Sequence, residues 1–173
     1  MISPTENEKF AIPLIAPEVS CDAFGNFVPN VLRDSFDRIR NASGLIHGGQ
    51  LPKGSPPTQV MKEMKGNSKT KYEIVQIIPS IWGGSGCHPD NLNFPSYKQI
   101  KTKSTTPSTL DLEIADHLSE QGNMIVFSFD YKYEGTDVFP LKTRRFIDVI
   151  HKNGHRMFFR NGAELKLAGS LDS

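Results

Sequence analysis

The stretch around which the fold is organised runs from Tyr72 to Lys98 and reads YEIVQIIPSIWGGSGCHPDNLNFPSYK. It begins with an apolar run typical of a strand, which Pro79 ends because proline has no amide hydrogen to give to a sheet. A loop with three glycines follows, and glycine allows turns and close backbone contacts. The single tryptophan, one of two cysteines, a histidine and an Asp-Asn pair lie between Trp82 and Leu92. We therefore expect a strand and a loop that holds either a core anchor or a functional site.

The composition sets broad limits on the class of protein. The 173 residues fit one domain with a real core. The formal net charge of +1, from 20 Lys and Arg against 19 Asp and Glu, neither demands nor excludes a polyanionic partner, because local patches decide binding. Two cysteines permit one disulfide. No apolar run reaches the length of a membrane span and the N-terminus lacks a signal-peptide pattern, so we expect no membrane association and, if the chain is secreted, transport by another machine.

The N-terminal half predicts little regular structure besides one helix. Residues 1–27 are rich in proline and predict an extended arm. Apolar side chains recur at helical spacing from Val28 to Ile39, which predicts a helix that stops at residues 41–44. Residues 46–71 predict a long loop, with a short helical turn around Thr58–Met64.

The C-terminal half predicts a helix followed by an antiparallel β-meander. Strict alternation of apolar and polar residues indicates a half-buried strand, and Asn-Gly pairs are strong hairpin signals. The expected elements are a helix at Leu110–Gln121, strands at Met124–Tyr133, Arg145–Lys152 and His155–Arg160, and turns at Asn153-Gly154 and Asn161-Gly162. The fold class is therefore α+β, with an arm and helix over residues 1–45 and an α+β unit over residues 46–173 of one structural domain.

Several pieces of residues 72–162 form an ordered series that is specific as a whole. They are Ile77-Ile78-Pro79, Trp82 to Gly86, Asp90-Asn91-Leu92, Tyr97-Lys98, Gly122, the strand from Val126 to Tyr133, Gly135 to Asp137, and Arg144 to Phe146. In this order they resemble the DNA/RNA non-specific endonucleases found as toxin modules in bacterial polymorphic toxins, which belong to the His-Me finger (ββα-metal) nucleases.

The resemblance implies a ββα-metal-like unit packed with the C-terminal antiparallel β-meander. It also implies metal-dependent hydrolysis of phosphodiester bonds in DNA or RNA, with Mg²⁺ or Mn²⁺ as the divalent cofactor. The implied partners are a nucleic-acid backbone and a cognate immunity protein. The implied location is the cytoplasm, or secretion as cargo of a larger toxin or secretion system.

The chain departs from this family at two positions that carry the chemistry. Gln76 stands where the family has the histidine that activates water, and an amide has no proton to exchange near pH 7, although it can orient a water. The family's metal-binding asparagine has no match between Lys98 and Ser108. Three interpretations follow: an engineered inactive nuclease, a natural nuclease with a displaced base, and a nuclease-like scaffold that binds rather than cuts.

The candidate catalytic residues are Gln76, His88, Asp90 and Asn91, and the candidate metal ligands are Asp90, Asn91 and Asn93. His88 is either a displaced base or an exposed loop histidine. Asp90 and Asn91 either hold a hydrated Mg²⁺ through oxygen or stabilise a turn.

Five cations are candidate phosphate contacts if they share one face: Lys98, Lys101, Lys103, Arg144 and Arg145. Trp82 is either a core anchor or a platform for an unpaired base. A function of a different class, an unrelated effector enzyme, would use Cys87 and a histidine as nucleophile and base.

Overall fold

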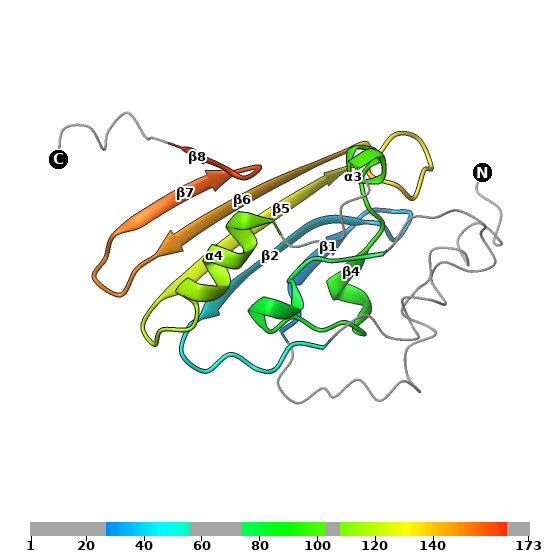
Figure 1. The fold of residues 1–173 in the computed structure, drawn as a ribbon. Coiled ribbons are helices and arrows are strands. Elements are labelled where there is room, and N and C mark those ends of the chain that lie inside the picture. The colour runs from blue at the N-terminus through cyan, green and yellow to red at the C-terminus, as the bar shows by residue number, and fades with distance from the viewer. Residues whose placement is uncertain (1–26, 56–73, 103–107, 166–173) are drawn as a thin grey trace.

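The computed structural model describes residues 27–55, 74–102 and 108–165. The fold is α+β, because most of its regular structure is antiparallel sheet and a few short helices accompany it. Figure 1 shows the main sheet. The sheet has six strands, all antiparallel to their neighbours, in the spatial order β1 (Asn30–Arg33), β2 (Ile39–His47), β5 (Met124–Lys132), β6 (Lys142–Ile150), β7 (Arg156–Arg160) and β8 (Ala163–Leu165).

A second, two-stranded sheet comes from the stretch around which the fold is organised. It pairs β3 (Val75–Gln76) with β4 (Leu92–Asn93). Within the described residues, the helices are the 3₁₀ helices η2 (Ser80–Trp82) and η3 (Pro89–Asn91) and the α-helices α3 (Tyr97–Thr102) and α4 (Thr109–His117). Side chains that follow β3, with others from η2 and α4, share one hydrophobic core with the main sheet, so these elements cover the same face of it.

Strand β5 defines the two faces of the main sheet. Its odd-numbered side chains from Ile125 to Tyr131 are buried, and its even-numbered side chains are partly or fully exposed. Successive side chains of a strand point to opposite faces, so the predicted alternation is confirmed. We call the side that carries Val126, Ser128, Asp130 and Lys132 the open face.

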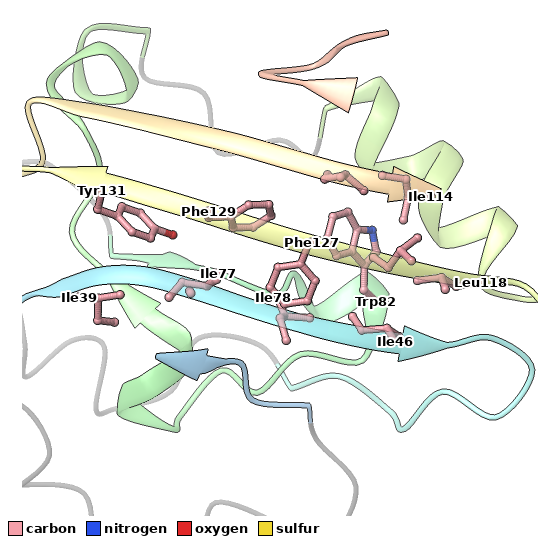
Figure 2. Close-up of a cluster of buried hydrophobic side chains, with 13 residues drawn as sticks. Ile39, Ile46, Ile77, Ile78, Trp82, Ile114, Leu118, Phe127, Phe129 and Tyr131 are labelled. Carbon is pink, nitrogen blue, oxygen red and sulfur yellow. The ribbon is translucent and has the colours of Figure 1, made fainter. Parts of the chain in front are cut away.

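Trp82 anchors the core on the covered face. Figure 2 shows it beside Phe127 of β5 and Ile114 of α4. The ring is fully buried, and its indole N–H donates a hydrogen bond of 2.9 Å to the carbonyl oxygen of Asp111. A buried tryptophan needs such a partner for its polar edge. The interpretation of Trp82 as a core anchor is therefore confirmed.

The helix predicted from Val28 to Ile39 is wrong, because this segment forms β1, a turn and the start of β2. Asp34 stabilises the turn: its Oδ1 accepts hydrogen bonds from the backbone N–H groups of Phe36 (2.9 Å) and Arg38 (3.0 Å). An aspartate that bonds the backbone two residues on favours a turn over a helix. Asp34 and Arg38 are four residues apart, a spacing that also suits a helix, but here they form an ion pair of 2.8 Å across this turn.

The other predictions for the N-terminal half either lie within β2 or concern residues that the structure does not describe. Residues 41–44, the predicted helix stop, lie inside β2, as does the division at residue 45. The predicted turn at Thr58–Met64 and all of the predicted arm except Phe27 lie outside the described residues. Phe27 donates its backbone N–H to the carbonyl oxygen of Gly83 at 2.8 Å, so the start of the described chain pairs with the glycine loop.

The predicted meander is confirmed as β5, β6 and β7, within a larger sheet. Strand β6 starts at Lys142 rather than Arg145, and β8 adds a further strand. The Asn161-Gly162 turn between β7 and β8 has φ values of 50° and 85°, which suits Asn-Gly because both residues tolerate positive φ. Strands β1 and β2 complete the sheet on the other side of β5.

Helix α4 confirms the helix predicted from Leu110, although it ends at His117 rather than Gln121. The Ser108 hydroxyl accepts a hydrogen bond of 3.1 Å from the backbone N–H of Asp111, which fixes the start of the helix. Helix α3 was missed, because its sequence is short and largely polar.

Replacing neighbouring residues of β5 tests the assignment of the two faces. Phe127→Ala should lower the free energy of unfolding by about 3–5 kcal/mol, because it leaves a cavity in the core. Val126→Ala, on the open face, should change it by about 0.5 kcal/mol or less. Urea denaturation measures both, and equal losses in the two variants would contradict the assignment.

Candidate functional site

Asn91 fastens the glycine loop to the segment that follows β3. Its fully buried side chain accepts the N–H of Ile78 at 2.7 Å and donates to the carbonyl oxygens of Ile78 (2.9 Å) and Ser85 (2.6 Å). A Cβ on Gly84 would lie 1.8 Å from the Ile78 carbonyl oxygen, so the loop needs glycine there. Both polar atoms of the Asn91 side chain thus stabilise the loop.

Gln76, the first of the candidate catalytic residues, lies in β3 opposite Leu92. Its Nε2 donates to the carbonyl oxygen of Ser55 at 3.1 Å, and its Oε1 is buried with no hydrogen-bond partner in the described part of the chain. The amide cannot take a proton from water near neutral pH. A displaced base would therefore have to come from another residue.

His88, the candidate for that base, is exposed and caps η3. Its Nδ1 accepts the backbone N–H of Asp90 at 3.1 Å. The Nδ1 atom of His88 is thus engaged in holding the start of η3. The side chain of Gln76 is hydrogen-bonded to a different residue, Ser55. The structure does not bring His88 and Gln76 together in a hydrogen-bonded pair.

The candidate metal ligands are engaged in other contacts. Asp90 Oδ1 lies 2.8 Å from Nη2 of Arg33, and Asn93 Oδ1 accepts the backbone N–H of Phe94 at 2.9 Å. The positive charge of the Arg33 guanidinium, at this distance, already balances the negative charge of the Asp90 carboxylate, which a metal cation would need as a ligand. Among residues 27–55, 74–102 and 108–165, no three His, Cys, Asp or Glu side chains are grouped to hold a metal ion. These residues do not fit a hydrated Mg²⁺ or Mn²⁺.

Cys87 is buried and disulfide-bonded. The nucleophilic form of cysteine is the free thiolate, which a disulfide sulfur does not provide. This bond argues against an effector enzyme that uses Cys87 and a histidine.

The five candidate phosphate contacts do not form one patch. Lys98 is exposed on α3, Lys101 lies on the same helix, and Lys103 lies outside the described residues. Arg144 and Arg145 are neighbours in β6, so their side chains leave opposite faces of the sheet. Of this pair, Arg144 alone is on the open face, where it lies opposite Asp130 of β5 in the strand register.

Arg145 belongs to the covered face. Its Nη2 lies 3.2 Å from Asp111 Oδ1, and its guanidinium lies 4.7 Å from the centre of the Phe129 ring. Such a cation–aromatic contact, together with the ion pair, ties β6 to α4. Arg145 therefore stabilises the packing of α4 on the sheet.

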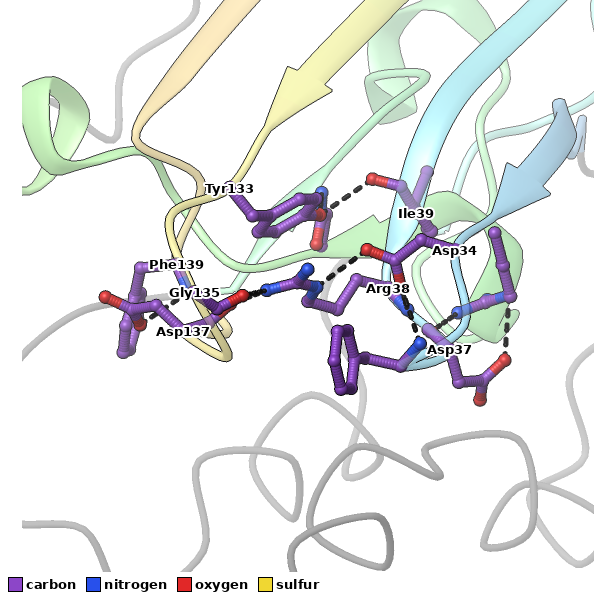
Figure 3. A network of polar contacts seen from close by, with 11 residues as sticks. Asp34, Asp37, Arg38, Ile39, Tyr133, Gly135, Asp137 and Phe139 are labelled. Carbon is purple, nitrogen blue, oxygen red and sulfur yellow. Dashed lines mark hydrogen bonds and ion pairs between the residues drawn. The ribbon is translucent and has the colours of Figure 1, made fainter. Parts of the chain in front are cut away.

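A second polar network holds one end of the sheet together (Figure 3). Besides its ion pair with Asp34, Arg38 donates to the carbonyl oxygens of Gly135 (2.9 Å) and Asp137 (2.8 Å), which joins the β1–β2 turn to the β5–β6 turn. Tyr133 lies under the same guanidinium, 4.4 Å from the ring centre, and burial raises the pKa of its hydroxyl to about 12. This end of the sheet is thus fixed by contacts between two turns.

A basic hollow lies on the open face at this end of the sheet. It has a volume of about 660 Å³ and draws its lining from four adjacent strands. The lining residues are Leu32, Arg40, Asn41, Asp130, Tyr131, Lys132, Lys142 and Arg144. We call this feature the basic hollow.

The basic hollow carries an excess of positive charge. Within the part of the chain that the structure describes, its four cationic side chains form no ion pair. Asp130 is the single carboxylate in the lining, and it accepts a hydrogen bond of 2.8 Å from Asn41 Nδ2. Chemically, the hollow suits an anion that is held by fixed positive charge without proton transfer.

Sequence reasoning found Arg144 but missed Arg40, Lys132 and Lys142. The alternation in β5 and β6 places Lys132, Lys142 and Arg144 on one face and would have separated Arg144 from Arg145. Arg40 lies next to an irregularity in the β1–β2 pairing, in a segment predicted as helix, and no local signal marks it.

Comparisons with known proteins add no assignment. No protein-family model matches the chain, and a search of curated proteins finds no match. Within the described ranges, no helix is long and apolar enough to cross a membrane.

Proposed function

We propose that this chain is a nuclease-like module that binds the backbone of nucleic acid without cutting it. The observation that carries the proposal is the basic hollow, in which four cations form no ion pair within the described residues. Phosphate contacts need fixed positive charge and do not depend on sequence. The near-neutral net charge of +1 means that binding would come from this patch rather than from the whole surface.

The proposal includes a ββα-type origin for the organising stretch. Strands β3 and β4 form an antiparallel pair and α3 follows them in the chain, the order of a ββα unit. Gln76 in β3 then occupies the position of the water-activating histidine in the nucleases that the sequence resembles. The chain would descend from a toxin module that reaches nucleic acid in the cytoplasm as cargo and meets an immunity protein.

Binding without cutting is favoured by the contacts of the candidate catalytic side chains. General-base catalysis needs a group that takes a proton from water, and loss of it costs about 10²–10⁴ in rate. Gln76 cannot do this, His88 caps η3, and Asp90 is paired with Arg33. Charge stabilisation by a cation would also need oxygen ligands that Asn91 and Asn93 use for backbone contacts.

A cleavage assay separates binding from cutting. Neither this chain nor Gln76→His should nick supercoiled plasmid or degrade RNA with Mg²⁺ or Mn²⁺, because a histidine in β3 would still lack a metal site. Gel electrophoresis measures the products, with EDTA as the control for metal dependence. Metal-dependent cutting by the unmodified chain would overturn the proposal and favour the interpretation as an active nuclease with a displaced base.

The salt dependence of binding tests the basic hollow. Arg144→Ala should weaken binding of DNA and RNA alike and flatten the plot of log K against log salt by about one unit, since one phosphate contact is lost. Lys152→Ala removes the same charge from the β6–β7 turn, where Lys152 lies 3.5 Å from Glu120, and should leave that slope unchanged. Fluorescence anisotropy over a salt series measures both. Equal effects of the two variants would point to non-specific attraction.

A further inference from the structure

Two phenylalanine rings lie on the open face beside the basic hollow. Phe146 follows Arg144 by two residues in β6, about 7 Å along the strand, and shares its face. Phe158 lies on β7 opposite Asp148, and both rings are half-buried. Phe159, the next residue of β7, packs against the core from the covered side. The two rings thus continue the surface of the hollow across the sheet.

Each ring is covered by an arginine rather than by core side chains. The guanidinium of Arg160 lies 5.6 Å from the centre of the Phe146 ring, and that of Arg156 lies 5.1 Å from the centre of the Phe158 ring. Both arginines are exposed, and Arg156 also pairs with Asp148. Aromatic rings and guanidinium planes are the two kinds of surface on which unpaired bases stack.

We propose that the open face binds single-stranded nucleic acid, with phosphates in the basic hollow and unpaired bases stacked on Phe146 and Phe158 or on the arginines that cover them. This inference rests on the proposed function and names its substrate class. The binding of single strands combines a positive groove with aromatic platforms, and the open face has both side by side.

The rings are what favour a single strand over a duplex. In a duplex the faces of the bases are stacked on one another, so a ring on a sheet has no base face to contact. The hollow alone would bind both forms through phosphate. Trp82, the single tryptophan of the chain, is buried and takes no part in this surface.

Fluorescence anisotropy at low salt, about 50 mM, tests this inference with four labelled probes. They are oligothymidylate, oligouridylate and an abasic single strand, each of about 20 nucleotides, and a duplex of the same length. We expect the two base-bearing single strands, DNA and RNA, to bind more tightly than the duplex and the abasic strand. Phe146→Leu and Phe158→Leu should each weaken them by about 5- to 100-fold while leaving the abasic strand unchanged.

Matched variants separate stacking from folding. Phe146→Tyr and Phe158→Tyr keep a ring and should keep the affinity for single strands, and thermal unfolding checks that each leucine variant is folded. Leu45→Ala removes an apolar side chain on the open face that is 50% exposed and lies on β2, away from the rings, and should change nothing.

The outcomes distinguish the inference of single-strand binding from the proposed function, which is binding of the nucleic-acid backbone. Equal binding of all four probes, unaffected by the leucine variants, would overturn the single-strand inference and leave backbone binding standing. An equal loss for the abasic strand in those variants would also overturn it. No binding of any probe would overturn both and favour a protein as the occupant of this face.

Discussion

Burial of the odd-numbered face of β5 against Trp82 and α4 is the constraint on which the rest of this structure depends. Phe127 and Phe129 supply large apolar surfaces, and burying such rings is a dominant favourable term in folding. Once that face is covered, period-2 geometry sends every even-numbered side chain of β5 to the other side. The cross-strand partners of these residues on β2 and β6 follow, which assembles the open face.

The same constraint gives adjacent residues opposite roles. Arg145 is drawn into the packing of α4 by Asp111 and the Phe129 ring, whereas Arg144, one residue earlier, lines the basic hollow. The same holds for two candidate catalytic residues: the buried side chain of Asn91 holds the glycine loop, and His88 caps η3. The four cations of the basic hollow, by contrast, lie on the open face of the sheet.

The parts that sequence predicted correctly carry their signal locally. Alternation in β5, the Asn-Gly turns and the Ser108 cap each depend on a few neighbouring residues, so patterns suffice. The β1–β2 hairpin was missed because its apolar spacing also fits a helix, and only the pairing with β5 and the Asp34 turn decide between them. The basic hollow was missed because it combines residues from strands whose pairing no local pattern reveals.

The central claim is that the open face, not the surroundings of Gln76, is the functional surface. Backbone amide chemical shifts in a ¹⁵N-labelled sample titrated with oligothymidylate test this most directly. The account predicts that the largest changes fall on β5, β6 and β7 around Lys132, Arg144 and Phe158, and that Arg144→Ala makes them smaller at the same oligothymidylate concentration. Changes concentrated between Gln76 and Asn93, with β6 and β7 unaffected, would contradict it.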